Sequence, residues 1–192
     1  MLAKPLGMSR FTLLLAAYFV LVINIPLAAR LVTILQHTEG LSLGMVLSLP
    51  LFFGSVFYLL FSVWTFRYLA RPFAVVLLLA SSLVSYAMYY YGTVFAMDMI
   101  RNLVETNPGE ARAYLNVNLA LWWLFTGVVP AIIFAVLPLR SQSLTRELGS
   151  KLFSMTLAVV VVLGIAALYY KDYASLGRNN HELNKLIIPT HY

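Results

Sequence analysis

Five long apolar stretches, separated by shorter polar ones, set the pattern of the chain. They cover residues 11–31, 45–66, 73–90, 117–137 and 152–170. Each is close to the ~20 residues that an α-helix needs to cross the hydrocarbon core of a bilayer. The alternation with a period of two residues that is typical of outer-membrane barrels is absent. The pattern therefore predicts an all-α membrane protein with five transmembrane helices.

The composition supports a membrane protein. Hydrophobic residues make up 61% of the chain and charged residues 10%, which leaves too little polar surface to cover a water-soluble globule. The net charge is +6, but the basic residues stand at the ends of apolar runs and do not gather on one polar face. Lipid headgroups, and not nucleic acid, are therefore the expected anionic partners.

The distribution of charge predicts an orientation. With the amino terminus in the cytosol, the cytoplasmic segments contain one acidic residue, Glu147, and the basic residues Lys4, Arg10, Arg67, Arg71, Arg140, Arg146 and Lys151. The remaining acidic residues then lie outside: Glu39, Asp98, Glu105, Glu110, Asp172 and Glu182. Because Lys and Arg in short loops set the topology of membrane proteins, we expect an N-in, C-out arrangement.

Polar and helix-breaking residues are few within the apolar stretches. Pro26 predicts a kink near one end of the first stretch, after which "LAARLVTIL" either continues the helix or lies in the membrane interface. Asn24 and the group Ser81, Ser82 and Ser85 are predicted to form packing contacts or interhelical hydrogen bonds and not a transport route. Ionisable residues are absent near the centres of the five stretches, which argues against an ion or proton pathway.

Aromatic residues gather towards the end predicted to face outward. They close the third and fifth stretches and open the fourth: Tyr86, Tyr89, Tyr90, Tyr91, Trp122, Trp123, Tyr169, Tyr170 and Tyr173. Amphipathic rings prefer the headgroup level, so an anchoring belt is the simpler prediction and a specific lipid cradle the alternative. Trp64, Phe66 and Tyr68 form a smaller belt towards the inner side.

The segment 99–115, "MIRNLVETNPGEARAYL", is the most polar passage between the first and last apolar stretches. Asn102, Thr106 and Glu110 are spaced by four residues, so on one helix they would share a face. Pro108 favours a new helix with Asn107 as its N-cap, and Glu110 would then complete a capping box. Alternatively, the carboxylate would pair with an ammonium group while Asn and Thr bind a phosphate, as a zwitterionic lipid headgroup requires. Residue chemistry leaves both interpretations open.

Two passages carry a resemblance to a known family. "YGTVFAMDMIRNLVETNPGEA" resembles the outer segment after the third membrane helix of the phosphoethanolamine transferases that modify lipid A, a family that includes the mobile colistin-resistance enzymes. "AALYYKDYASLGRNNHELNKLIIP" resembles the exit of that family from its fifth helix, and the similarity includes "RYLARP". The resemblance implies a membrane domain over residues 1–170, with a periplasmic helical segment at about 91–116. Residues 171–192 would begin the bridge to a periplasmic catalytic domain.

The resemblance also implies an activity in the inner membrane of a Gram-negative bacterium. The family moves phosphoethanolamine from phosphatidylethanolamine to a lipid A phosphate through a phosphorylated threonine, in a zinc-dependent domain. The transfer reduces the negative charge of the outer membrane and gives resistance to polymyxins such as colistin. In this family an Asn, a Thr and a Glu of the outer segment are associated with the donor headgroup, and they match Asn102, Thr106 and Glu110.

The chain departs from the family at its end, "IIPTHY", because no nucleophilic threonine or zinc-binding residues of a catalytic domain are present. His37, His181 and His191 are scattered and do not have a metal-ligand spacing. We therefore expect an excised membrane domain that binds no zinc and is inactive alone, with its own catalytic domain as a partner in the longer protein. The rival hypothesis is a small non-enzymatic carrier or scaffold of the inner membrane.

Overall fold

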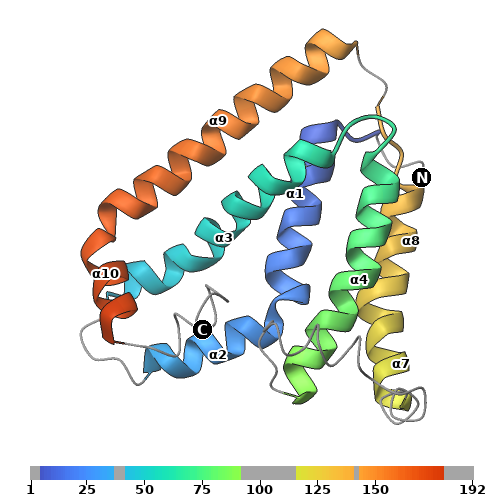
Figure 1. Ribbon diagram of the computed structural model, residues 1–192. Helices are drawn as coiled ribbons and strands as arrows, with labels where there is room; N and C mark the ends of the chain where they lie inside the picture. The colour runs from blue at the N-terminus through green and yellow to red at the C-terminus, as the bar shows by residue number, and fades with distance from the viewer. Residues whose placement is uncertain (1–4, 37–41, 92–115, 141–142, 180–192) are drawn as a thin grey trace, which may run out of the picture.

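The computed structural model describes residues 5–36, 42–91, 116–140 and 143–179 (Figure 1). These residues are helical apart from short connections and an isolated parallel bridge between Leu6 and Leu139. In chain order the elements are α1 (Met8–Tyr18), the π-helix η1 (Phe19–Ile23), α2 (Ile25–Gln36), α3 (Leu43–Trp64), α4 (Ala70–Tyr91), α7 (Val117–Trp123), the π-helix η2 (Leu124–Val128), α8 (Val129–Val136), α9 (Leu144–Leu168) and α10 (Tyr170–Asn179).

The helices of the described part are long and apolar enough for up to five membrane spans. Four are Leu43–Trp64, Ala70–Tyr90, Val117–Val136 and Thr145–Leu168, and the fifth is the pair Met8–Ile23 and Ile25–Thr33 if it is counted as one span. That pair is bent by 56° at Asn24, two residues before Pro26. The predicted kink is therefore confirmed, because a proline within a helix lacks the amide donor and its ring clashes with the preceding turn.

The fifth helix begins earlier than hydropathy indicates. We expected the span to start at residue 152, but α9 starts at Leu144, about two turns before it. Arg146, Glu147 and Lys151 are therefore helical residues and not loop residues. The helix extends beyond the predicted span because an apolar window marks the lipid-exposed length of a helix, whereas a helix can extend into the polar headgroup region.

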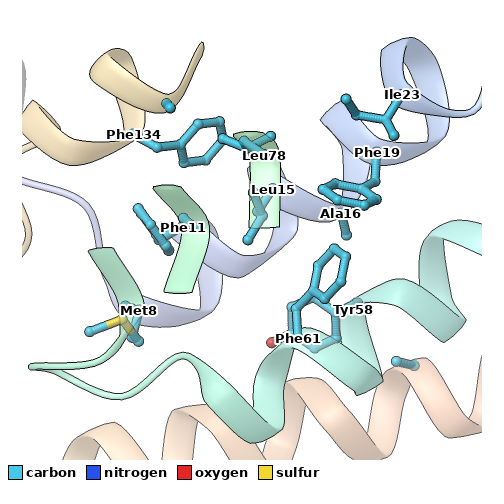
Figure 2. Close-up of a cluster of buried hydrophobic side chains, with 14 residues drawn as sticks. Met8, Phe11, Leu15, Ala16, Phe19, Ile23, Tyr58, Phe61, Leu78 and Phe134 are labelled. Atoms are coloured by element: carbon cyan, nitrogen blue, oxygen red, sulfur yellow. The ribbon is translucent and has the colours of Figure 1, made fainter. Parts of the chain in front are cut away.

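The core of the bundle forms around α1 (Figure 2). Phe11 and Leu15 are completely buried, and the ring of Phe11 packs edge-on against Phe134 of α8, with centroids 5.4 Å apart. Phe19 of η1 packs against Phe61 of α3, with ring centroids 4.8 Å apart. Lipid tails are as apolar as these side chains, so such interfaces are stabilised by close packing and not by exclusion of water.

The other helices flank α1, with α4 and α8 on one side and α3 and α9 on the other (Figure 1). Helices α2 and α10 lie at the end of the bundle opposite to the start of α1. Much of the outer surface is apolar, including Leu47 on α3 and Phe153 and Leu163 on α9. Exposed apolar helix faces of this extent fit a lipid environment.

Basic residues gather at the end of the bundle where α1 and α9 begin. This end, called the basic end below, carries one acidic residue among the described residues, Glu147, and the basic residues Arg10, Arg67, Arg71, Arg140, Arg146 and Lys151. Arg71 Nη2 donates a hydrogen bond of 3.0 Å to the carbonyl of Leu137, the C-cap of α8, where a cation is favourable.

Candidate functional site

The three residues predicted to bind a headgroup, Asn102, Thr106 and Glu110, lie outside the described residues. The structure does describe both ends of the segment that contains them. The segment leaves the end of α4 and returns at the start of α7, at the end of the bundle opposite to the basic end (Figure 1). The candidate site is therefore defined by the side chains that hold these two helix ends together.

Four aromatic side chains, Tyr86, Tyr89, Tyr90 and Trp122, form a cluster that we call the aromatic frame. The ring of Trp122 stacks on Tyr89 with centroids 5.2 Å apart, and Tyr86 lies 4.4 Å from Tyr90. The spacing of three and four residues brings the three tyrosines to one side of α4. Tyr86 is buried, whereas Tyr89 and Tyr90 are about half exposed, so the frame is both a packed contact and an open surface.

Asn116 closes the site at the start of α7. It is the N-cap of this helix, and its Oδ1 accepts a hydrogen bond of 2.8 Å from the amide of Leu119. The same oxygen accepts a second bond of 3.0 Å from the hydroxyl of Tyr86 on α4. One side-chain oxygen thus caps α7 and joins it to α4. Nearby, Trp122 Nε1 is buried without a hydrogen-bond partner in the described ranges.

A proline explains the π-helical break below this site. Pro130 has no amide hydrogen to donate to the carbonyl of Thr126, four residues before it. The chain forms η2 at this point, and the hydroxyl of Tyr18 donates a hydrogen bond of 2.8 Å to the Thr126 carbonyl. Local π-helical geometry and a side-chain donor are the usual means by which a membrane helix accommodates a proline.

Two serines of α4 form hydrogen bonds to the two π-helical segments, Ser82 to η2 and Ser85 to η1. Thr126 donates its hydroxyl proton to the carbonyl of Trp122, so Ser82 is the donor in the 2.7 Å contact between the hydroxyls of Ser82 and Thr126. Ser85 donates a bond of 2.7 Å to the carbonyl of Ile23 at the end of η1. The prediction that Ser82 and Ser85 form interhelical hydrogen bonds is confirmed.

A second polar contact joins the segment after α9 to α3. Ser42, the N-cap of α3, donates a hydrogen bond of 2.7 Å to Asp172 Oδ2 of α10. The hydroxyls of Ser48 and Tyr173 lie 3.3 Å apart, and the ring of Tyr173 packs 6.0 Å from that of Phe52. Tyr173, one of the tyrosines predicted to form the anchoring belt, therefore packs against α3.

Lys151 is a residue whose role the sequence analysis missed. It was assigned to the cytoplasmic segments, but it is only 6% exposed. Its Nζ donates a hydrogen bond of 3.0 Å to the carbonyl of Thr65, the C-cap of α3, and lies 3.6 Å from the ring centroid of Phe66. Its place directly before an apolar run, four residues after Glu147, was the available signal that it belongs to the helix and not to a loop.

The residues described here do not fit the zinc site that the resemblance implies for the family. They contain no group of three or more His, Cys, Asp or Glu side chains that could hold a metal ion.

The apolar bundle, its exposed lipid-facing surface and its proline-broken spans define an all-α membrane protein. The chain belongs to the family described as phosphoethanolamine transferase EptA/EptB, which matches residues 53–192. It is 32% identical over 194 positions to phosphoethanolamine transferase EptA of Escherichia coli K12, covering 99% of this chain and 35% of that protein. It is 27% identical to phosphatidylethanolamine transferase Mcr-1 of Escherichia coli over 153 positions, 77% of this chain and 28% of that protein.

A solved structure shares the fold. It is the integral membrane protein lipooligosaccharide phosphoethanolamine transferase A (EptA) from Neisseria meningitidis, with a TM-score of 0.85 and 26% identity. The match covers 97% of this chain and 35% of that structure. The chain thus spans about a third of the length of these relatives and corresponds to the membrane part of their family.

Proposed function

We propose that this chain is the membrane domain of an enzyme that moves phosphoethanolamine from phosphatidylethanolamine to lipid A and so gives resistance to polymyxins. The family match over residues 53–192 carries this proposal. The zinc-dependent transfer belongs to a catalytic domain in the part of such proteins that this chain does not span. The domain described here holds the donor lipid and keeps the catalytic domain at the membrane surface, where tethering gives a high effective concentration.

The donor headgroup binds at Asn102, Thr106 and Glu110 in this proposal. The Glu110 carboxylate pairs with the ammonium group, and Asn102 and Thr106 bind the phosphate. The bond between Tyr86 and Asn116 supports it, because it fixes both ends of the intervening segment at one point of the bundle. The exposed rings of Tyr89 and Tyr90 offer an amphipathic surface at the same point.

The orientation in this proposal is N-in, in the inner membrane of a Gram-negative bacterium, with the aromatic frame facing the periplasm. The gathering of six basic side chains at the opposite end supports it, because Lys and Arg favour the cytoplasmic side. The donor site and the bridging residues 171–192 then face the compartment in which lipid A is modified. Labelling a single cysteine introduced at residue 102 with a reagent that does not cross membranes tests this; protection of that cysteine in intact spheroplasts would contradict it.

Headgroup binding is tested on the purified chain. Phosphatidylethanolamine is titrated into the unmodified chain and into the variants Glu110→Gln and Asn102→Ala. The variant Glu105→Gln is the matched control, because it removes the same charge from the same segment. Loss of a charge-assisted hydrogen bond should weaken binding about tenfold in Glu110→Gln, whereas Glu105→Gln should bind like the unmodified chain. Equal affinity of all variants would contradict the headgroup site.

The capping interpretation makes a different prediction for Glu110. An acid in a capping box contributes about 0.5–2 kcal/mol to the free energy of unfolding and does so without contacting lipid. Because glutamine can also complete a capping box, Glu110→Ala is the variant that tests it: if Glu110→Ala lowers thermal stability and leaves phosphatidylethanolamine affinity unchanged, Glu110 is a cap. Solute uptake by proteoliposomes that contain only this chain would instead favour a carrier.

A further inference from the structure

The basic end contains an open, charged cavity, and none of its lining residues belongs to the proposed donor site. Its volume is about 240 Å³, and it lies where the start of α1 meets the connection from α8 and the start of α9. Its lining includes Gly7, Ser9, Arg10, Arg140, Glu147 and Ser150. Ser9 and Ser150 hydroxyls lie 3.2 Å apart, so α1 and α9 touch along one side of the cavity.

Backbone contacts hold the two arginines in place. Gly7 is the N-cap of α1 and accepts a hydrogen bond of 3.1 Å from the amide of Arg10. The amide of Arg140 donates a bond of 2.8 Å to the carbonyl of Leu6, and the amide of Leu6 donates one of 2.8 Å to Pro138. The two guanidinium groups thus extend from a pair of backbone segments that are bonded to each other at the cavity.

The guanidinium groups of Arg10 and Arg140 have no hydrogen bond or ion pair with the described residues, in contrast to Arg71, which bonds the Leu137 carbonyl. Two arginines against one carboxylate give the lining a formal charge of +1, and the surrounding basic end adds further positive charge. Guanidinium groups bind phosphate oxygens in a bidentate manner, and the serine hydroxyls can donate to the same group.

Apolar residues near the lining residues in the sequence favour a lipid as the source of the phosphate. Val136 on α8 and Leu148 and Leu152 on α9 are exposed apolar side chains close in sequence to Arg140 and Glu147. A free phosphate ion would make no contact with these apolar side chains, whereas the acyl chains of a lipid would cover them. Basic cavities between transmembrane helices are common binding places for acidic lipid headgroups.

We propose that this cavity binds the phosphodiester of an acidic phospholipid in the leaflet at the basic end. Arg10 and Arg140 hold the phosphate oxygens, and Ser9 and Ser150 donate to the polyol or phosphate. This lipid is separate from the donor lipid, because the starts of α1 and α9, which line the cavity, lie at the end of the bundle opposite to the end of α4 and the start of α7 (Figure 1). It joins the starts of α1 and α9 to the end of α8 through one shared ligand.

The test uses the purified chain in an uncharged detergent, titrated with short-chain phosphatidylglycerol at fixed low ionic strength. The double variant Arg10→Gln and Arg140→Gln should weaken binding by about tenfold or more. The matched control is Arg67→Gln with Arg146→Gln, which removes the same charge from the same end outside the cavity and should change binding less than about threefold. Equal weakening in both double variants would overturn the proposal.

Two competition experiments identify the ligand, and a conservative variant controls for loss of folding. Arg140→Lys keeps the charge but loses the bidentate fork, so it should fold normally and weaken binding by about threefold or more; unchanged binding would overturn the role of Arg140. Phosphatidylcholine of the same chain length should compete poorly, and equal competition would refute an acidic-lipid site. Displacement by an equal concentration of inorganic phosphate would show a site for free phosphate and overturn the lipid.

Discussion

The hydroxyl of Tyr18 lies 2.8 Å from the carbonyl of Thr126 and donates a hydrogen bond to it across the bundle. Tyr18 directly precedes η1, and Thr126 lies in the middle of η2, so the bond links the two π-helical segments. The α-helical partner of that carbonyl would be the amide of residue 130, which is a proline. The bond therefore satisfies a backbone group that the sequence leaves without its helical donor.

Replacing Tyr18 by Phe should destabilise the chain by about 0.5–1.5 kcal/mol, the order of magnitude expected for one interhelical hydrogen bond in a membrane protein. The ring remains in contact with Phe134, so packing is largely kept. Unfolding of the purified chain by a denaturing detergent measures the change. Tyr68→Phe is the matched control, because Tyr68 is 85% exposed and its loss of a hydroxyl should change little. Equal effects in the two variants would contradict the role of the Tyr18 bond.

Gly127 of η2 lies close against Ser82 of α4. A Cβ at this position would lie 3.0 Å from Ser82 Cβ and 3.1 Å from its hydroxyl oxygen. Gly127→Ala should therefore separate the two elements and cost about 1–3 kcal/mol, as overpacking does in other cores. Gly164→Ala in α9 is the control, because a Cβ there meets nothing within 4 Å. A Gly127→Ala chain as stable as the control would show that η2 can move away from α4 without cost.

The helical class and the approximate positions of the apolar spans follow from the sequence, because hydropathy over windows of about 20 residues depends on local composition alone. The kink near Pro26 follows for the same reason, since the missing amide is a property of one residue. The start of α9 does not follow, because "SLTRELGS" is polar and helical at once and only its capping and packing decide where the helix begins.

The candidate site could be predicted only in part. The aromatic residues and serines were identified as groups, but Tyr86 and Asn116 lie 30 residues apart, and no local signal pairs them. Lys151 was assigned to a cytoplasmic segment from the distribution of charge, and its partner, the Thr65 carbonyl, is a backbone group that has no sequence signature. Asn102, Thr106 and Glu110 remain predictions from spacing and resemblance.

Lys151 should stabilise the basic end through the carbonyl of Thr65. Lys151→Met keeps most of the apolar stem but leaves this carbonyl without its donor and removes the cation from the ring of Phe66. We expect a loss of about 1–3 kcal/mol in unfolding by a denaturing detergent. Arg146→Gln on the same helix, which is exposed, should change stability by less than about 0.5 kcal/mol. A neutral or stabilising Lys151→Met would show that burial of the charge costs more than its bonds return.

Asn116 offers a test of whether the frame around the candidate site matters for lipid binding. Asn116→Ala removes both bonds of one oxygen, the cap to Leu119 and the link to Tyr86, and should cost about 1–2 kcal/mol. Asn116→Asp keeps an acceptor for both donors and should retain most of that stability, because aspartate is an equally good N-cap.

Binding of phosphatidylethanolamine separates the two consequences of these variants. If the bond between α4 and α7 fixes the ends of the segment with Asn102 and Glu110, Asn116→Ala should lower affinity and Asn116→Asp should not. Tyr86→Phe removes the hydroxyl that bonds Asn116 and leaves the Asn116 cap of α7 in place, so it tests the bond between α4 and α7 separately from the cap. Normal affinity in Tyr86→Phe together with reduced affinity in Asn116→Ala would assign the effect to helix capping. The segment would then bind lipid without the hydrogen bond between α4 and α7.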